Sequence, residues 1–321
     1  MDFKEIGWNG FLMKVPEEMH LTRQGGNANQ GAFALESERH LIEFNWSPIP
    51  KKPKPLMSIV ETVVDQAKKD AKKRKHKFSM KGKRDATVCG HKAIYLHLET
   101  MVDEHYYVWY CEETNRAIII RFVCETFDEK SRDTIKKFLD SLKCHMKGKN
   151  VWSLMKIRFE SPRSFLLRKA DIGVGRAHIE LEEIKLSAFT ERARTIYVDY
   201  FSMANVMFKD TYEDPEKWFE KDFLKNLKKA LKKRRIKFKS SGETEVGSHK
   251  AVIQQAMTRS GFTSRKINLY ANASWYCSEM NRMYSVTVTS GITRPFFLRR
   301  EPSKEDHEEL FNGILMSFQC H

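Results

Sequence analysis

A cysteine is followed directly by a histidine at two places in the chain, Cys144-His145 and Cys320-His321. These pairs are the residues best suited to binding a metal ion. Thiolate and imidazole are the ligands that zinc prefers, and Cys111 or Cys277 could join each pair. Structural zinc sites usually contain a close pair of cysteines, however, and the six cysteines here form no C-x-x-C motif. We therefore predict no metal and no cofactor. If a metal is bound after all, the candidate ligands are Cys144, His145, Cys320 and His321.

Catalytic motifs are missing from the sequence. A nucleophilic cysteine needs a histidine or a positive field that lowers its pKa, and spacing alone supplies neither for Cys111 or Cys277. Core packing explains the repeated Trp-Tyr-Cys more simply. His91 and His249 each follow a small residue and precede a strand, where a hydrogen bond within a turn is expected. Because no Gly-rich phosphate loop, G-x-S-x-G or H-E-x-x-H occurs, we predict a protein that is not an enzyme.

The chain contains an internal duplication. KKRKHKF at 72–78 matches KKRRIKF at 232–238, and WYCEETNR at 109–116 matches WYCSEMNR at 275–282. The ends of the two halves, near Cys144 and Cys320, match as well. We predict a first repeat at residues 1–147, a second at 151–321 and a short linker at 148–150.

Each repeat has the same expected order of elements. A strand at 41–46 or 195–201 precedes a helix, and three strand-like runs follow it, at 92–99, 106–112 and 117–124 in the first copy. Asn115 and Asn281 lie in the turn between the last two runs, where a positive φ is needed. A final helix closes each repeat. The predicted fold class is α+β, with an antiparallel sheet and helices in each of two tandem repeats.

This order of elements resembles the PsbP-like fold. The resemblance rests on His-Lys-Ala before a strand, on the hairpin from Trp-Tyr-Cys to Asn-Arg, and on a final helix that ends apolar-apolar-x-Ser-apolar, at 138–142 and 314–318. The superfamily includes the extrinsic photosystem subunit PsbP and the yeast nuclear protein that binds the Ran GTPase. The resemblance implies an α/β/α sandwich in each repeat and a tendency to bind proteins, without a shared active site. No lumen-targeting segment is present, which argues against a photosynthetic role.

Positive charge is concentrated in the same element of both repeats. The chain carries 57 Lys and Arg against 42 Asp and Glu, a net charge of +15 with His neutral. Residues 68–84 contain ten basic residues and one acidic residue, and residues 225–239 contain nine and none, so the rest of the chain is slightly acidic. The expected binding residues are Lys68, Lys69, Lys72, Lys73, Arg74, Lys75, Lys225, Lys228, Lys229, Lys232, Lys233, Arg234 and Arg235.

These charges predict an anionic partner. The leading hypothesis is a non-catalytic protein whose basic helices bind the phosphate backbone of RNA or DNA. A module or scaffold that binds an acidic protein surface is the first alternative, and an enzyme with a cleft between the repeats is the second. A solvated lysine face without a partner explains any single helix equally well. No recognisable nucleic-acid module is present, and the sequence does not indicate an oligomeric state.

Location is predicted from what the sequence lacks. No stretch approaches the eighteen or so apolar residues of a membrane helix. The N-terminal MDFKEIGWNG has none of the apolar core of a secretory signal. We therefore expect a cytoplasmic protein with no membrane insertion.

Overall fold

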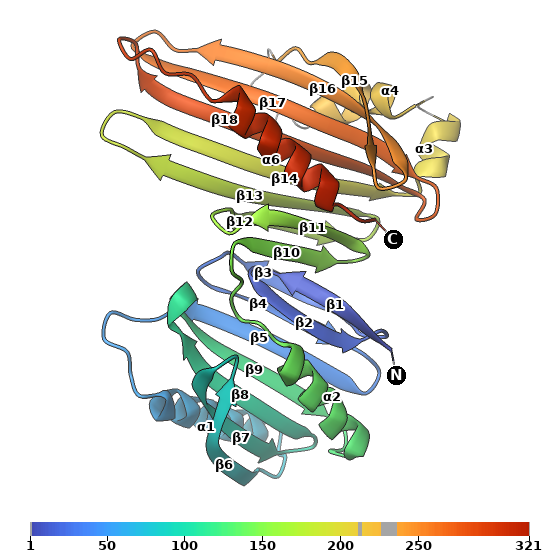
Figure 1. The fold of residues 1–321 in the computed structure, drawn as a ribbon. Helices are drawn as coiled ribbons and strands as arrows, with labels where there is room; N and C mark the ends of the chain where they lie inside the picture. Colours follow the sequence, from blue (N-terminus) through green and yellow to red (C-terminus); the bar gives the residue numbers. More distant parts are fainter. Residues whose placement is uncertain (1, 211–213, 226–235, 321) are drawn as a thin grey trace. The chain divides into compact units, whose positions relative to one another are not determined.

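The computed structural model describes residues 2–210, 214–225 and 236–320. The chain divides into two compact units, Met1–Met155 and Lys156–His321, called unit 1 and unit 2 below (Figure 1). Each unit is described by itself.

Unit 1 is built mainly of antiparallel strands. Its large sheet has seven strands in the order β3-β4-β5-β9-β8-β7-β6, and β1 pairs with β2 and β10 in another sheet. Helix α1 lies between β5 and β6 in sequence, and α2 follows β9. The elements of unit 1 are β1 Phe3–Trp8, β2 Phe11–Pro16, β3 His20–Gly26, β4 Gly31–Glu36, β5 His40–Pro48, α1 Leu56–Lys73, β6 Ser79–Val88, β7 His91–Glu99, β8 Asp103–Cys111, a 3-10 turn Glu112–Thr114, β9 Arg116–Cys124, α2 Glu129–Ser141 and β10 Lys149–Leu154.

Aromatic side chains fill the space between the layers of unit 1. The ring of Phe11 on β2 lies 5.4 Å from that of Phe44 on β5 and 6.2 Å from that of Phe33 on β4. Phe138 on α2 completes this core, 5.0 Å from Phe122 on β9. The β1–β2 hairpin and α2 therefore cover one face of the large sheet, while α1 packs on β7 and β8.

Unit 2 has a seven-stranded sheet with the equivalent strand order, β12-β13-β14-β18-β17-β16-β15. Its short strand β11 packs against the last helix, α6. The elements of unit 2 are β11 Ile157–Pro162, β12 Leu166–Gly173, β13 Arg176–Leu186, β14 Glu191–Ser202, α3 Ala204–Asp210, α4 Pro215–Trp218, a π-helical turn Phe219–Phe223, β15 Lys239–Val246, β16 His249–Ser260, β17 Ser264–Cys277, β18 Arg282–Pro295 and α6 Lys304–Ser317.

A polar network is buried on one face of the sheet in unit 2. The Asn272 amide donates to Ser285 Oγ at 2.6 Å and to Thr287 Oγ1 at 2.9 Å, and its carbonyl oxygen accepts from Ser274 at 2.8 Å. All four side chains are fully buried. Because buried polar groups are tolerated when they are paired, this network is compatible with a stable sheet.

The predicted fold class is wrong. Strands dominate both units, and three antiparallel sheets make a sandwich of sheets where the PsbP-like α/β/α sandwich placed helices on both faces. The sequence interpretation missed the strands that open each repeat, β1 to β4 in unit 1 and β11 in unit 2. These strands are short and several alternate poorly, so their periodicity is weak. They supply the additional layer in unit 1. The hairpin turn that the sequence indicates at residues 171–176 is present between β12 and β13.

Two local predictions are confirmed. Asn115 and Asn281 adopt φ values of 52° and 50° at the turns that join β8 to β9 and β17 to β18. The strands and final helices expected downstream of residue 90 are present as β7, β8, β9 and α2. In the described ranges no helix is long and apolar enough to cross a membrane.

Candidate metal centre

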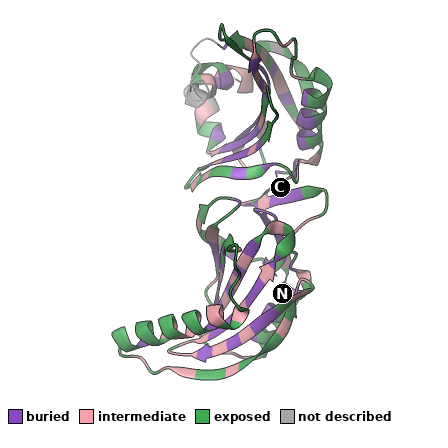
Figure 2. Ribbon diagram, turned by 90° about the vertical axis from the view of Figure 1, so that its left-hand side faces the viewer, coloured by how far each residue is buried: buried purple, intermediate pink, exposed green. Residues whose placement is uncertain are grey.

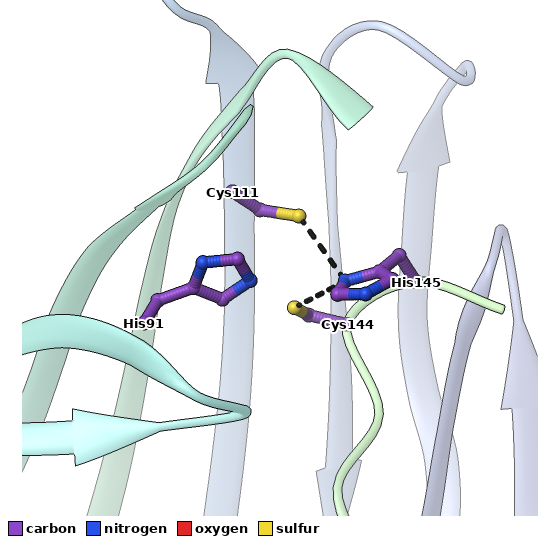
Figure 3. A group of neighbouring side chains, drawn as sticks. All are labelled: His91, Cys111, Cys144 and His145. Atoms are coloured by element: carbon purple, nitrogen blue, oxygen red, sulfur yellow. Dashed lines mark hydrogen bonds between the residues drawn. The ribbon is translucent and has the colours of Figure 1, made fainter. Parts of the chain in front are cut away.

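Two cysteines and two histidines converge at one end of the sheet in unit 1 (Figure 3). His91 begins β7 and Cys111 ends β8, and the antiparallel pairing of Ala93 with Trp109 brings these two ends together. Cys144 and His145 follow α2, where the chain pairs back onto β2 through Lys143 and Leu12. Three separate segments thus supply the four side chains.

The distances between the four side chains suit a tetrahedral metal ion. His145 Nδ1 lies 3.5 Å from Cys111 Sγ and 3.4 Å from Cys144 Sγ. A tetrahedral zinc with ordinary bond lengths places sulfur and nitrogen ligands about 3.6 Å apart. One ligand atom from each residue lies within 4.8 Å of all the others. Small side-chain rotations would therefore bring the four donors to bonding distance.

Unpaired polar atoms also point to a ligand here. His91 Nε2 is buried without a hydrogen-bond partner, although its ring lies 5.6 Å from that of His145. Glu113 Oε2 lies 3.7 Å from this nitrogen, within ion-pair range but beyond hydrogen-bond distance. A buried nitrogen without a partner is unfavourable, and a metal ion would satisfy it.

Both thiols of the set are poor acids in the metal-free chain. Hydrogen bonding with Cys144, together with burial, raises the pKa of Cys111 far above the ordinary thiol value. Hydrogen bonding with Cys111 lowers the pKa of Cys144, but hydrogen bonding with Cys89 and burial outweigh it and raise the pKa to about 12. Binding of a divalent metal at neutral pH would therefore release protons from both sulfurs.

Unit 2 repeats this arrangement. His249 at the start of β16, Cys277 at the end of β17 and Cys320 after α6 bring their ligand atoms within 4.8 Å of one another. Burial raises the pKa of Cys320 to about 12, and the neighbouring Cys277 thiol adds to this shift. His321, the expected fourth member, lies outside the described residues.

The sequence singled out part of each set. Cys144 and His145 belong to the cluster of unit 1, and Cys320 belongs to that of unit 2, each with the Trp-Tyr-Cys cysteine. His91 and His249, which the sequence assigned to turns, join these clusters in the structure and were not among the predicted candidate ligands. The signal was present in the repeated His-Lys-Ala, but its meaning depends on the strand register, which sets each histidine opposite a cysteine.

Another group of donors in unit 1 is less suited to a metal. His97 Nε2 is hydrogen-bonded to Asp103 at 2.7 Å, and the rings of His97 and His105 stack at 4.3 Å with an angle of 25°. Nitrogen lone pairs lie in the ring planes, so stacked rings direct them side by side instead of toward one point. His97 and Asp103 therefore form a hydrogen-bonded pair of neighbouring strands.

The basic residues expected to bind an anion lie on α1 and directly after it. Lys68, Lys69, Lys72 and Lys73 are exposed on the helix, and Arg74 and Lys75 are exposed at its end. Figure 2 shows α1 as largely exposed. The buried residues of this helix are Val60 and Ala71. Among the described residues none of these six cations has a carboxylate within ion-pair distance. Of the equivalent set in unit 2, Lys225 is exposed. The rest of that set lies outside the described residues: Lys228, Lys229, Lys232, Lys233, Arg234 and Arg235.

Comparisons with known proteins do not place the chain in a family. No family model matches it, and no curated protein is similar to it at a significant level. Among solved structures, an immunity protein, TplEi from Pseudomonas aeruginosa in complex with a peptide, covers 99% of this chain and 98% of its own length. The identity is 10% and the TM-score 0.31, which is too low to assign a fold or a function. None of these comparisons points to a PsbP-like protein.

Proposed function

We propose that this chain is a non-catalytic protein that binds a zinc-class metal ion in each repeat. The observation that carries the proposal is the convergence of two thiols and two imidazoles in unit 1, with sulfur to nitrogen distances of 3.4 and 3.5 Å. Four protein ligands fill a tetrahedral shell and leave no position for a substrate, which is typical of structural zinc. The same residue types recur in unit 2.

The metal would hold the fold together. Its ligands come from the start of β7, the end of β8 and the segment after α2, so one ion would tie the final helix to the sheet. Cross-links between segments that are distant in sequence stabilise a fold by restricting the unfolded chain. The reduced thiols that this role needs agree with the predicted cytoplasmic location, and the six cysteines are all free.

Cobalt binding tests this proposal. We expect the reduced, metal-free protein to develop the intense visible bands of tetrahedral Co²⁺ and the near-ultraviolet bands of thiolate coordination, and Zn²⁺ to displace the cobalt. Cys111→Ser and Cys144→Ser should remove the part of the signal that belongs to unit 1. Cys124→Ser is the matched control, because Cys124 is a buried cysteine of the same unit outside the cluster.

Circular dichroism of each variant separates loss of ligands from loss of folding. Tetrahedral bands that persist at full intensity in a double variant of Cys111 and Cys144, or that never form in the wild-type protein, would contradict the proposal.

The exposed face of α1 supports binding of an anionic partner as a second function. Six cations follow one another along the helix and its end, and none of them has an ion-pair partner in the part of the chain that the structure describes. Point charges of this kind bind phosphate backbones without reading sequence, so RNA or DNA is the simplest partner and an acidic protein surface the alternative.

A titration with RNA and DNA at several salt concentrations tests this second function. We expect binding that weakens steeply with salt and that is lost when Lys68, Lys69, Lys72 and Lys73 are changed to Glu. The matched control changes Lys130 and Lys136 to Glu, since both are exposed on the other helix of unit 1. Equal losses in both variants would show a general charge effect and exclude α1 as the binding element.

A further inference from the structure

One end of the sheet in unit 2 exposes a group of phenylalanines. Phe189 lies in the β13–β14 turn, Phe262 in the β16–β17 turn, and Phe296 and Phe297 directly after β18. These side chains are 66%, 92%, 58% and 65% exposed. Exposed aromatic residues that gather at one place usually mark an interaction site, whereas scattered ones are normal.

The strand register places these turns side by side. The Phe296 amide donates to the carbonyl oxygen of Thr263 in the β16–β17 turn, and the rings of Phe296 and Phe297 lie 5.7 Å apart. Glu191, two residues after Phe189, pairs with Thr293 on β18. Because the ladder continues to the pairing of Ser264 with Pro295, the aromatic residues are held just beyond the last hydrogen-bonded pairs.

Positive charge lies directly behind the aromatic tips. Arg192 and Arg265 each follow a tip phenylalanine by three residues, and Lys266 follows Arg265; all three are exposed. They have no ion-pair partner in the part of the chain that the structure describes. Residues 262–266 and 292–300 contain five basic residues, of which Arg294 is buried, and no acidic one. The flanking carboxylates are Glu191, beside Arg192, and Glu301, which pairs with Arg259. From the tips of the turns toward the middle of the sheet, the exposed aromatic side chains therefore come first and the cations second.

We propose that this end of unit 2 binds the surface of an anionic lipid bilayer, with the phenylalanines in the acyl boundary and the cations at the phosphates. A bilayer presents its layers in the same order, anionic headgroups outside and hydrocarbon within, and accepts apolar tips of any shape. A folded protein partner would instead need matching pockets for four rings on three separate segments. The charge complementarity and the axial order favour the bilayer.

This mode of binding differs from a membrane span. The tips would enter only the interface, in keeping with the absence of a spanning helix from the described residues. It also differs from the role proposed for α1, which is purely electrostatic and lies in unit 1. The proposed contact is therefore a shallow one, made by the turns alone.

Sedimentation with vesicles tests the inference. We expect the full-length protein to sediment with vesicles of phosphatidylcholine and phosphatidylglycerol in equal parts, and to stay in solution with phosphatidylcholine alone. Changing Phe262 and Phe296 to Ser should weaken binding by roughly tenfold for each ring removed. Changing Arg265 and Lys266 to Glu should weaken it by about tenfold or more. Met101→Ser is the matched control, because Met101 is 72% exposed in the equivalent turn of unit 1.

A second readout reports the insertion itself. The natural tryptophans are buried, so a Phe262→Trp variant adds an indole at the tip that acyl chains can reach. We expect brominated lipid chains to quench this added fluorescence and to leave the wild-type signal nearly unchanged. Vesicle binding that survives in the phenylalanine variant, or no binding to anionic vesicles, would overturn the inference. So would concentration-dependent self-association without lipid that the same variant abolishes, because the tips would then contact a second copy.

Discussion

The seven-stranded sheets of the two units are alike at one end and differ at the other. Near the Cys and His clusters the strands correspond residue by residue, with Trp109 and Trp275 paired to Ala93 and Ala251 in the same register. At the opposite end unit 2 is longer: β17 and β18 have 14 residues each, whereas β8 and β9 have nine. The extension carries the exposed phenylalanines. The end with the Cys and His clusters is therefore alike in both units, whereas the opposite end is longer in unit 2.

A second difference concerns a buried face. At the positions of Asn272, Ser274 and Ser285, unit 1 has Tyr106, Val108 and Ile119. Tyr106 and Val108 form an apolar cluster with Val60 of α1. At the position of Thr287, unit 1 has Arg121, which forms an ion pair with Glu104. The same strand pairing thus tolerates a largely apolar face with an ion pair at its edge in one unit and a hydrogen-bonded face in the other. The contrast teaches that strand order is maintained by the backbone ladder, while each face is free to change.

The largest effect expected from this comparison is that of metal removal. If both units hold an ion, a chelator should destabilise each by about 4 kcal/mol when free zinc had been about a thousandfold above its Kd. Hydrogen exchange measured by mass spectrometry distinguishes the units, because peptides around Cys111 and Cys277 report them separately. Cys144→Ser should remove the response of unit 1 alone. A chelator response confined to one unit would show that the shared end has diverged in function.

The second effect is acid sensitivity, expected in both units. Burial lowers the pKa of His105 in unit 1 and of His307 in unit 2 to about 4, and the proximity of His97 adds to the shift of His105. Each histidine binds its proton more tightly in the unfolded chain, so stability is complete above about pH 6.5 and falls as the pH drops toward 4. The loss should reach up to roughly 3 kcal/mol per unit.

Denaturant unfolding across this pH range measures the loss. His307→Asn should flatten the pH dependence of unit 2, and His105→Asn that of unit 1, while His20→Asn, at an exposed position, should change neither. His307 forms one hydrogen bond with Ser290. If the dependence of unfolding free energy on pH is unchanged in the His307 variant, other groups cause the acid sensitivity of unit 2.

The smallest expected effect concerns the stability contributed by the buried sheet face of each unit, which is hydrogen-bonded in unit 2 and largely apolar in unit 1. Asn272→Ala leaves Ser274, Ser285 and Thr287 without their common partner and should destabilise unit 2 by about 2 kcal/mol. The corresponding apolar truncation in unit 1, Val108→Ala, should have a similar effect through loss of packing. Thermal unfolding compares them. A much smaller effect of Asn272→Ala would show that the network is replaced by water and is not required for stability.

The sequence predicted repetition and local turns well, because identical residues at matching positions reveal a duplication without any knowledge of the fold. Asn115 and Asn281 were recognised because few residues tolerate a left-handed turn. The layers were predicted wrongly. The alternation of apolar and polar residues is weak in the opening hairpins. Most residues from His20 to Gly26 are exposed in the structure, so this strand needs no apolar face and its sequence does not predict a strand.

Only the ligands that are adjacent in sequence were predicted for the candidate metal site, because the others are brought together by strand pairing. Cys144 and His145 are adjacent in sequence and attracted attention, whereas His91 is brought to them only by the pairing of β7 with β8. Ligands from separate strands leave no signature in spacing. Recurrence of His-Lys-Ala in the second repeat was the available evidence, and its value became visible once the register was known.

The strand order of unit 1 also predicts an order of assembly. The central pair β5 and β9 joins residues 40–48 to residues 116–124, across a loop that contains α1 and three strands. The β7–β8 hairpin and the segment after α2 lie closer together in sequence, and closure of shorter loops is entropically easier. All four candidate metal ligands of unit 1 lie between residues 91 and 145. An ion could therefore bind to the later half of the unit first and present β9 as a finished edge for β5.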